Sequence, residues 1–244
     1  MEYLVFRLYG PLASWGEAAV GGDRPSGLTP TRSAVLGMIA AGLGIKRENT
    51  ERLNALRLSI GVAIKSYSTG SLVRDYHTAQ VPSQDKKRRF YTRKDELSIA
   101  KEKLNTVLSS RDYRSDGYWV VAIWQQPDKA FSLAEIKKGL VKPAFTPYLG
   151  RKACPLAAPL FPQFIESDLK SALDCEFPPI LQTDEQDKRW LGIGSYVTYL
   201  WQGQADALGC YEGVQSRNVW DEPISRMPWQ FGMRQEHQLT MVEE

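Results

Sequence analysis

The densest charge in this 244-residue chain lies in the run from Asp85 to Lys94, which contains six cations, one carboxylate and two adjacent aromatic rings. Lysine and arginine neutralise phosphates, and exposed aromatic rings stack on unpaired bases. The pattern is therefore typical of a surface for single-stranded nucleic acid, although a solvated basic loop would have the same composition. The candidate RNA contacts in this run are Lys87, Arg88, Arg89, Phe90 and Tyr91.

A second cluster surrounds the expected start of a helix, where Arg24, Thr31, Arg32 and Ser33 occur within ten residues. Free backbone N–H groups and the helix dipole favour an anion at such an end. The segment therefore predicts a phosphate site. The alternative is N-capping by Thr29 or Thr31, which explains one hydroxyl and leaves both arginines without a role.

Two glycine-containing turns add further candidates. Trp15 lies between glycines at the end of the first expected strand, where it is either a stacking platform for a base or a core residue. Tyr148, Gly150, Arg151 and Lys152 form a turn in which glycine would let an RNA backbone approach closely and the cations would hold it. An ordinary surface turn is the alternative for the second site.

Catalysis has one candidate, the run Arg74-Asp75-Tyr76-His77. Metal-free RNA cleavage needs a base, an acid and a cation at one phosphate, and these residue types supply them. On an extended strand, however, neighbouring side chains point to opposite faces. We therefore expect Tyr76 and His77 to contact RNA without cleaving it, and the chain not to be an enzyme.

Metal and cofactor chemistry has little support in the sequence. Three widely spaced cysteines and two histidines match no metal-ligand spacing, so neither a metal nor a cofactor is expected. A net charge of +3 is too small to diagnose nucleic-acid binding, so the clusters carry that argument. No apolar run approaches the roughly 20 residues of a membrane span, and no signal peptide precedes the first strand, so we expect a cytoplasmic protein.

The elements that must position these residues alternate between strand and helix. Strands are predicted at Tyr3 to Tyr9, Leu58 to Lys65 and Tyr118 to Trp124 from their alternation or their β-branched and aromatic content. Helices are predicted after Thr31, from its apolar stripe, and after Ser132, from a capping box. This order is most of a β-α-β-β-α-β pattern, so the predicted fold class is α+β and ferredoxin-like.

The predicted core is interrupted once. It occupies residues 1–75 and 116–145, and residues 76–115 form a basic insertion that the core does not require. Long insertions in compact domains are usually functional. Residues 146–244 are expected to be loop-rich, with short strands at 196–201 and 238–242.

Several motifs occur in register over residues 1–162, with weaker echoes at Asp221 to Phe231 that include Asp221-Glu222-Pro223. They are GPLASWG, RPSGLTPTRSAVLGMIAAGLGI, RDYHTA and FTPYLGRKACPLAAPLF. Together they resemble the CasD family of type I-E CRISPR Cascade complexes, within the RAMP superfamily. The resemblance implies an RRM-related fold with a thumb-like insertion. The stretch 83–114 departs from the family pattern, so no thumb contact is transferred residue by residue.

The resemblance also implies a function. It suggests a non-catalytic subunit that grips the 5′ handle of the CRISPR guide RNA, contacts the backbone and large subunits of Cascade, meets target DNA only indirectly and touches no membrane. A related subtype's homologue cleaves repeat RNA, so a metal-independent endoribonuclease remains the alternative.

Overall fold

A computed structural model describes residues 1–17, 19, 21–84, 89–193, 196–209, 212–226 and 228–242. It is a mixed α/β structure built on antiparallel strands. The largest sheet has seven strands in the order β10-β11-β9-β4-β7-β1-β8, and every neighbouring pair is antiparallel. The strands are β1 Glu2–Tyr9, β4 Ile60–Ser68, β7 Tyr118–Gln125, β8 Gln163–Glu166, β9 Tyr196–Trp201, β10 Gln215–Arg226 and β11 Trp229–Val242.

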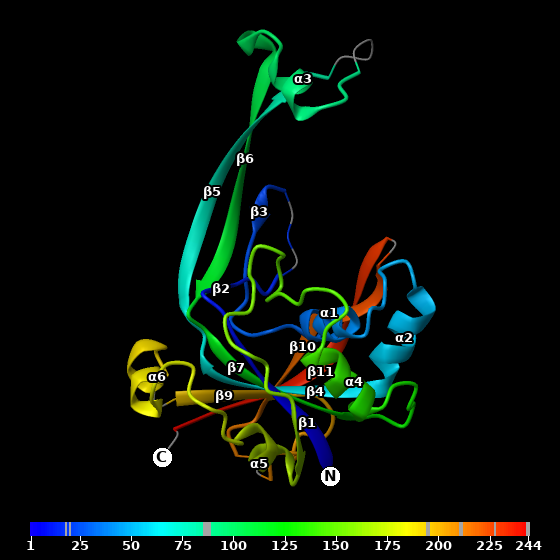
Figure 1. Cartoon of the computed structure of the whole chain (residues 1–244), viewed down its shortest axis with the longest axis vertical. Helices are drawn as coiled ribbons and strands as arrows, with labels where there is room; N and C mark the ends of the chain where they lie inside the picture. The colour runs from blue at the N-terminus through cyan, green and yellow to red at the C-terminus, as the bar shows by residue number, and fades with distance from the viewer. Residues whose placement is uncertain are drawn as a thin grey trace.

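Two helices cover one face of this sheet, α1 (Arg32–Gly42) and α4 (Leu133–Val141). Their apolar side chains pack on alternate residues of β1, β4 and β7 in a single core. The two helices touch at glycines, since a Cβ on Gly42 would lie only 2.8 Å from the carbonyl oxygen of Gly139. Figure 1 shows α1 on one side of the sheet and α5 (Leu169–Leu173) on the other.

The second face of the sheet is also buried. Apolar residues of β1, β4, β7 and β9 pack against α5 and the segment around Leu208. Lys65 lies on this face with only 1% of its surface exposed, and its Nζ donates to Tyr67 Oη at 2.8 Å and to Asp174 Oδ1 at 2.9 Å. The strand β1 therefore has two buried faces.

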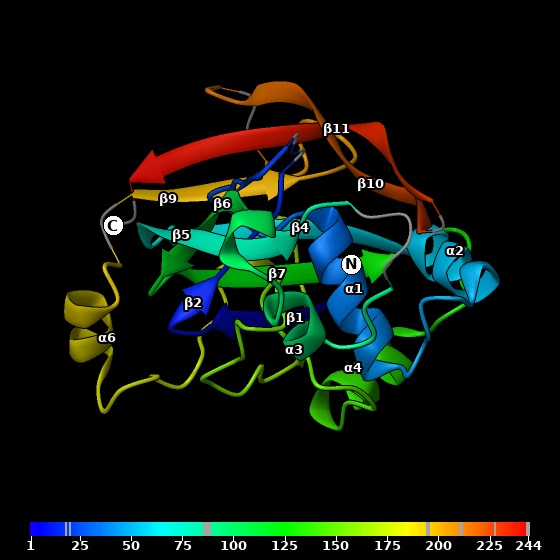
Figure 2. The same cartoon turned by 90° about the horizontal axis from the view of Figure 1, so that it is seen from above.

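Two further helices lie beyond the ends of the sheet in Figure 2, α2 (Thr50–Ser59) at one end and α6 (Asp184–Trp190) at the other. The predicted strand at Leu58 to Lys65 begins two residues later, because Leu58 and Ser59 belong to α2. The strand predictions at Tyr3 to Tyr9 and Tyr118 to Trp124 are confirmed, as are the helices after Thr31 and Ser132. None of the helices in the described part of the chain has the length and apolar character needed to cross a membrane.

Residues 71–84 and 89–115 leave the body of the molecule as a long hairpin (Figure 1). Strand β5 (Ser71–Pro82) pairs with β6 (Leu104–Ser115) along its whole length, and β6 also pairs with β2 (Leu12–Ala13) and β3 (Asp23–Arg24). The short helix α3 (Arg93–Leu97) and a 3₁₀ turn at Lys101–Lys103 lie at its far end.

The C-terminal region contains more strand than its sequence predicted. The strand at 196–201 is confirmed as β9, whereas the one predicted at 238–242 is only the end of the much longer β11. Strands β10 and β11 form a hairpin that extends the large sheet beyond β9. Its apolar periodicity is weak because ion pairs and exposed aromatic rings occupy many of its positions.

Candidate nucleic-acid interface

The N-terminus of α1 carries an anion, but that anion comes from the chain itself. Thr31 caps the helix by accepting a hydrogen bond from the backbone N–H of Ala34 at 3.2 Å, and its hydroxyl lies 3.0 Å from that of Ser33. The backbone N–H of Arg32 donates to Asp221 Oδ2 at 2.7 Å. The start of α1 therefore favours a negative charge, as its residue types predicted, but Asp221 of β10 supplies that charge in place of a phosphate.

Arg32 is 4% exposed. Its guanidinium donates to Glu222 Oε2 at 2.6 Å, to Gln202 Oε1 at 2.9 Å and to two backbone carbonyls. Burial lowers the pKa of Arg32, and the Glu222 carboxylate partly offsets this effect. The prediction that Arg32 holds a phosphate is wrong, because the side chain is inaccessible and already bound to an acid.

This ion pair belongs to a larger network that joins α1 and α2 to the β10–β11 hairpin. Arg57 also donates to Glu222, and Arg234 donates to Asp221 at 2.6 Å and to Glu236 at 2.6 Å. We call this network the paired cluster; its members are Arg32, Arg57, Arg234, Asp221, Glu222 and Glu236. Because every arginine in it meets a carboxylate, the cluster attaches the hairpin to the body and presents no free cation.

The prediction of Trp15 as a stacking platform is also wrong. Its ring is fully buried and meets Trp119 edge to face at 5.1 Å. The alternative of a core residue holds.

Gly150 serves a different purpose from the predicted one. It has a φ of +82°, and a Cβ there would lie 1.8 Å from the carbonyl oxygen of Ser14. Glycine therefore allows the turn to approach the chain's own backbone, not that of RNA. The turn does bring two predicted segments together, since Arg151 donates to the carbonyl of Arg24 at 3.0 Å. Lys152 is exposed beside it.

A groove of about 470 Å³ lies between α1, the 145–151 turn and the β10–β11 hairpin. It collects residues from two of the three predicted clusters, and no carboxylate is among the described residues that line it. The predicted residues in its lining are Thr31, Ser33, Tyr148, Gly150 and Arg151, and the unpredicted ones include Arg47, Phe145, Arg226, Trp229 and Phe231.

Two arginines in this groove share one indole. The guanidinium carbon of Arg47 lies 4.5 Å from the Trp229 ring centre and that of Arg226 lies 5.4 Å away, and Phe231 stacks on Trp229 at 5.6 Å. Within the described part of the chain, neither guanidinium forms an ion pair. Burial lowers the pKa of Arg226, and repulsion from Arg47 lowers it further. We call Arg47, Arg226, Trp229 and Phe231 the unpaired cluster.

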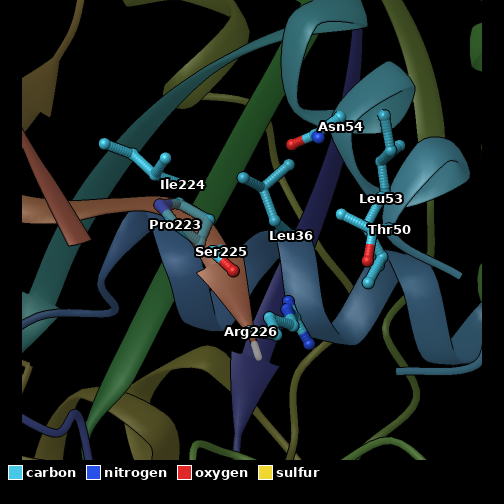
Figure 3. A pocket seen from close by; sticks show the side chains of 9 residues that line it. Leu36, Thr50, Leu53, Asn54, Pro223, Ile224, Ser225 and Arg226 are labelled. Atoms are coloured by element: carbon cyan, nitrogen blue, oxygen red, sulfur yellow. The ribbon is translucent and has the colours of Figure 1, made fainter. Parts of the chain in front are cut away.

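Figure 3 shows the surroundings of Arg226 at the end of β10, beside Leu36 of α1 and opposite Leu53 and Asn54 of α2. Only uncharged side chains accompany Arg226 around this small pocket. The sequence analysis missed Arg226, Trp229 and Phe231. The spacing of two between Trp229 and Phe231 was the available signal, but that stretch lay in the region predicted to be loop-rich.

The hairpin carries the remaining predicted residues away from the groove. Tyr76 is 65% exposed, and His77 is exposed on the opposite face of β5. Arg74 donates to both carboxylate oxygens of Asp112, at 2.7 and 3.0 Å, and these hydrogen bonds hold the pKa of Asp112 below its usual range. The run Arg74-Asp75-Tyr76-His77 does not converge on one point.

At the far end of the hairpin, Tyr91 is 80% exposed and the Arg89 guanidinium lies 5.5 Å from its ring. Phe90 is less exposed. Lys87 and Arg88 lie outside the described residues. The described part of the basic run, Arg89 to Lys94, leads into α3 at the far end of the hairpin, whereas α1, which lines the groove, lies in the body of the molecule (Figure 1). Among the described residues, no group of three or more histidine, cysteine or carboxylate side chains could hold a metal ion.

Comparisons with known proteins agree with this fold. The family model described as CRISPR-associated protein (Cas_Cas5) matches residues 3–236. The Cascade subunit CasD of Escherichia coli K12 is 36% identical over 170 residues, which cover 66% of this chain and 70% of that protein.

Two solved structures share the fold. A chain of a CRISPR RNA-guided surveillance complex aligns with a TM-score of 0.67 and 22% identity over 99% of this chain and 90% of its own. A Cas protein crystal structure aligns with a TM-score of 0.62 and 21% identity over 99% and 95%. With the family model matching nearly the whole chain, this protein belongs to the CasD/Cas5 family of CRISPR-associated proteins.

Proposed function

We propose that this chain is a non-catalytic RNA-binding subunit of a Cascade complex, and that it grips the 5′ handle of the CRISPR guide RNA. The observation that carries the proposal is the groove beside α1, where two segments predicted to bind RNA meet three arginines and no described carboxylate. Cations without acidic partners are what a phosphate backbone needs for binding. The similarity to a Cascade subunit supports the identity of the RNA.

The arrangement of the core strands supports the RRM-related fold that the family resemblance implies. Strands β8, β1, β7 and β4 are adjacent in that order, with α1 and α4 on one face, as a β-α-β-β-α-β unit of the ferredoxin-like type would arrange them. RRM domains bind bases on the open face of the sheet. Here α5 and its neighbours cover that face, so RNA has to bind elsewhere, and the groove at the edge of α1 supplies arginines for its phosphates.

The hairpin is the second part of the proposed interface. Both of its faces are exposed along most of β5, with Tyr76 on one and His77 on the other, and its far end is basic. A projection of this shape can lie across a single strand of RNA, with cations on phosphates and Tyr91 against a base. We propose that this hairpin acts as a thumb, and that the thumb and the groove hold two parts of the handle. We also propose that the chain contacts the backbone and large subunits of Cascade.

The absence of catalysis is part of the proposal. Arg74 is engaged by Asp112, and Tyr76 and His77 project to opposite sides, so no described acid, base and cation of this run face one phosphate. We expect the chain to protect repeat RNA rather than to cleave it.

The test uses the full chain and labelled repeat RNA in EDTA. We expect intact RNA, a preference for the handle over a scrambled strand, and an affinity that falls with salt at a log–log slope of about 0.7 per phosphate neutralised. Metal-independent cleavage would support an endoribonuclease instead. Equal affinity for unrelated strands would reduce the function to nonspecific binding.

A further inference from the structure

The unpaired cluster combines two features that one ligand could satisfy. Arg47 and Arg226 lie over the same indole, so two positive charges are close together in a groove without a described carboxylate. Trp229 is 50% exposed, and Tyr148, which also lines the groove, is 42% exposed. A ligand with an anionic group and a flat ring would relieve the repulsion and cover the aromatic surface.

The backbone that carries Arg226, Trp229 and Phe231 is held in place by contacts within the chain. Arg226 is directly opposite Trp229 in the register of the β10–β11 hairpin. The paired cluster attaches the same hairpin to α1 and α2 through Glu222, four residues before the end of β10. Preorganised groups lose little conformational entropy on binding, so a site built in this way favours affinity and a defined orientation.

The chemistry of the rest of the groove distinguishes between ligand classes. The hydroxyls of Thr31 and Ser33 and the guanidinium of Arg151 continue the polar lining away from the unpaired cluster. One nitrogen of Arg151, Nη1, is buried and has no hydrogen-bond partner in the described part of the chain. Hydrogen-bond donors placed beyond a first anion site suit a chain of phosphates better than they suit a single carboxylate side chain.

We propose that this groove is the subsite for one unpaired nucleotide of the bound RNA. Its phosphate lies between Arg47 and Arg226, its base lies against the aromatic wall of Trp229, Phe231 and Tyr148, and the next phosphate approaches Arg151. The inference rests on the proposed function, and it adds which nucleotide chemistry is recognised and by which residues.

The experiment is a set of double-mutant cycles on the full chain. Handle RNAs carrying one uncharged methylphosphonate or one abasic site at each position in turn are titrated against wild type, Arg226→Ala, Trp229→Ala and Arg52→Ala. Arg52 is the matched control, because its guanidinium also stacks on a ring, that of Phe131, but lies outside the groove. Thermal melting verifies that each variant is folded.

We expect Arg226→Ala to weaken handle binding about ten-fold or more, as the loss of a charge-assisted hydrogen bond does. The variant should also become insensitive to one particular methylphosphonate that weakens wild type. Trp229→Ala should lose sensitivity to the abasic site at the same or the adjacent nucleotide. Arg52→Ala should retain the full wild-type pattern.

Folded Arg226→Ala and Trp229→Ala variants that respond to every modified RNA as wild type does would overturn the subsite while leaving handle binding intact. The same conclusion follows if these variants bind RNA normally but lose a protein subunit on copurification. A wild-type chain that shows no preference for the handle would instead refute the proposed function, so the two failures are distinguishable.

Discussion

The paired and unpaired clusters both join arginines of the body to the β10–β11 hairpin, yet they have opposite consequences. In the paired cluster, Arg32 is 4% exposed and bonded to Glu222. In the unpaired cluster, Arg226 is partly buried and has an aromatic ring and a second arginine as neighbours. The paired arginines are used for folding, and the unpaired ones remain available for an external anion.

An arginine near a helix start or a turn is therefore not by itself evidence of a binding site for an external anion. What decides its role is whether the fold brings a carboxylate to it. Asp221 and Glu222 are adjacent in sequence and both reach the beginning of α1, so they neutralise the site that the local pattern suggested. Among the residues that the structure describes, no carboxylate lines the groove next to this site.

The largest loss of stability is expected when the acid is removed from the paired cluster. Glu222→Ala leaves the Arg32 guanidinium buried without its carboxylate, which should cost about 3 kcal/mol of unfolding free energy. Denaturant unfolding measures it. Glu96→Ala is the control, since its pair with Arg93 is exposed and should contribute below about 1 kcal/mol. A loss of similar size in both variants would mean that the cluster is not a special attachment.

Two arginine variants, one from each cluster, should differ in their effects on stability and on RNA binding. Arg57→Ala removes a partly buried bond to Glu222 and should reduce the unfolding free energy by about 1 kcal/mol. Arg47→Ala removes a cation–π contact but also a repulsion with Arg226, so its effect on stability should stay below about 0.5 kcal/mol. Only Arg47→Ala should weaken RNA binding directly. Equal loss of stability with unchanged RNA affinity for both would contradict the assignment of two roles.

An intermediate case is the pair at the base of the thumb, in which Asp112 is buried and Arg74 is exposed. Hydrogen bonds from Arg74 lower the pKa of Asp112. Its contribution to stability is therefore present above the ordinary aspartate pKa of about 3.9 and is lost as the pH falls through the lower folded value.

In Arg74→Gln, an NMR titration of the Asp112 carboxyl should show its pKa moving up toward the ordinary range. Arg93→Gln, which changes the far end of the hairpin, should leave that titration unchanged. An Asp112 pKa that is the same in wild type and Arg74→Gln would mean that the pair forms no effective interaction.

The smallest effect on stability is expected from shortening the thumb. Ala79 faces Val107 across the hairpin, so an Asn-Gly turn can join them and replace residues 80–106. The central core is untouched, and the unfolding free energy should change by less than about 0.5 kcal/mol. Guide RNA copurification should nevertheless fall. Loss of stability without loss of RNA would show that the hairpin belongs to the fold and not to the interface.

Local patterns predicted the parts of the fold whose signals are local. The capping box at Ser132 and Glu135 and the N-cap at Thr31 use contacts within three residues, and both are present. The helix at Thr50–Ser59 was missed because its hydrophobic residues make only a weak stripe and it is stabilised by packing against α1 and β10. A strand pattern starting at Leu58 therefore seemed the better interpretation.

Local sequence patterns predict the order of the main strands and helices, the insertion between β4 and β7, the concentration of cations within it, and a preference for negative charge at the start of α1. Which of the cations meet a carboxylate depends on long-range contacts. Arg32 and Asp221 are separated by 189 residues, and Arg47 and Trp229 meet across a comparable stretch of chain. A local pattern contains no information about such partners, because burial and neutralisation depend on how the β10–β11 hairpin closes against α1 and α2.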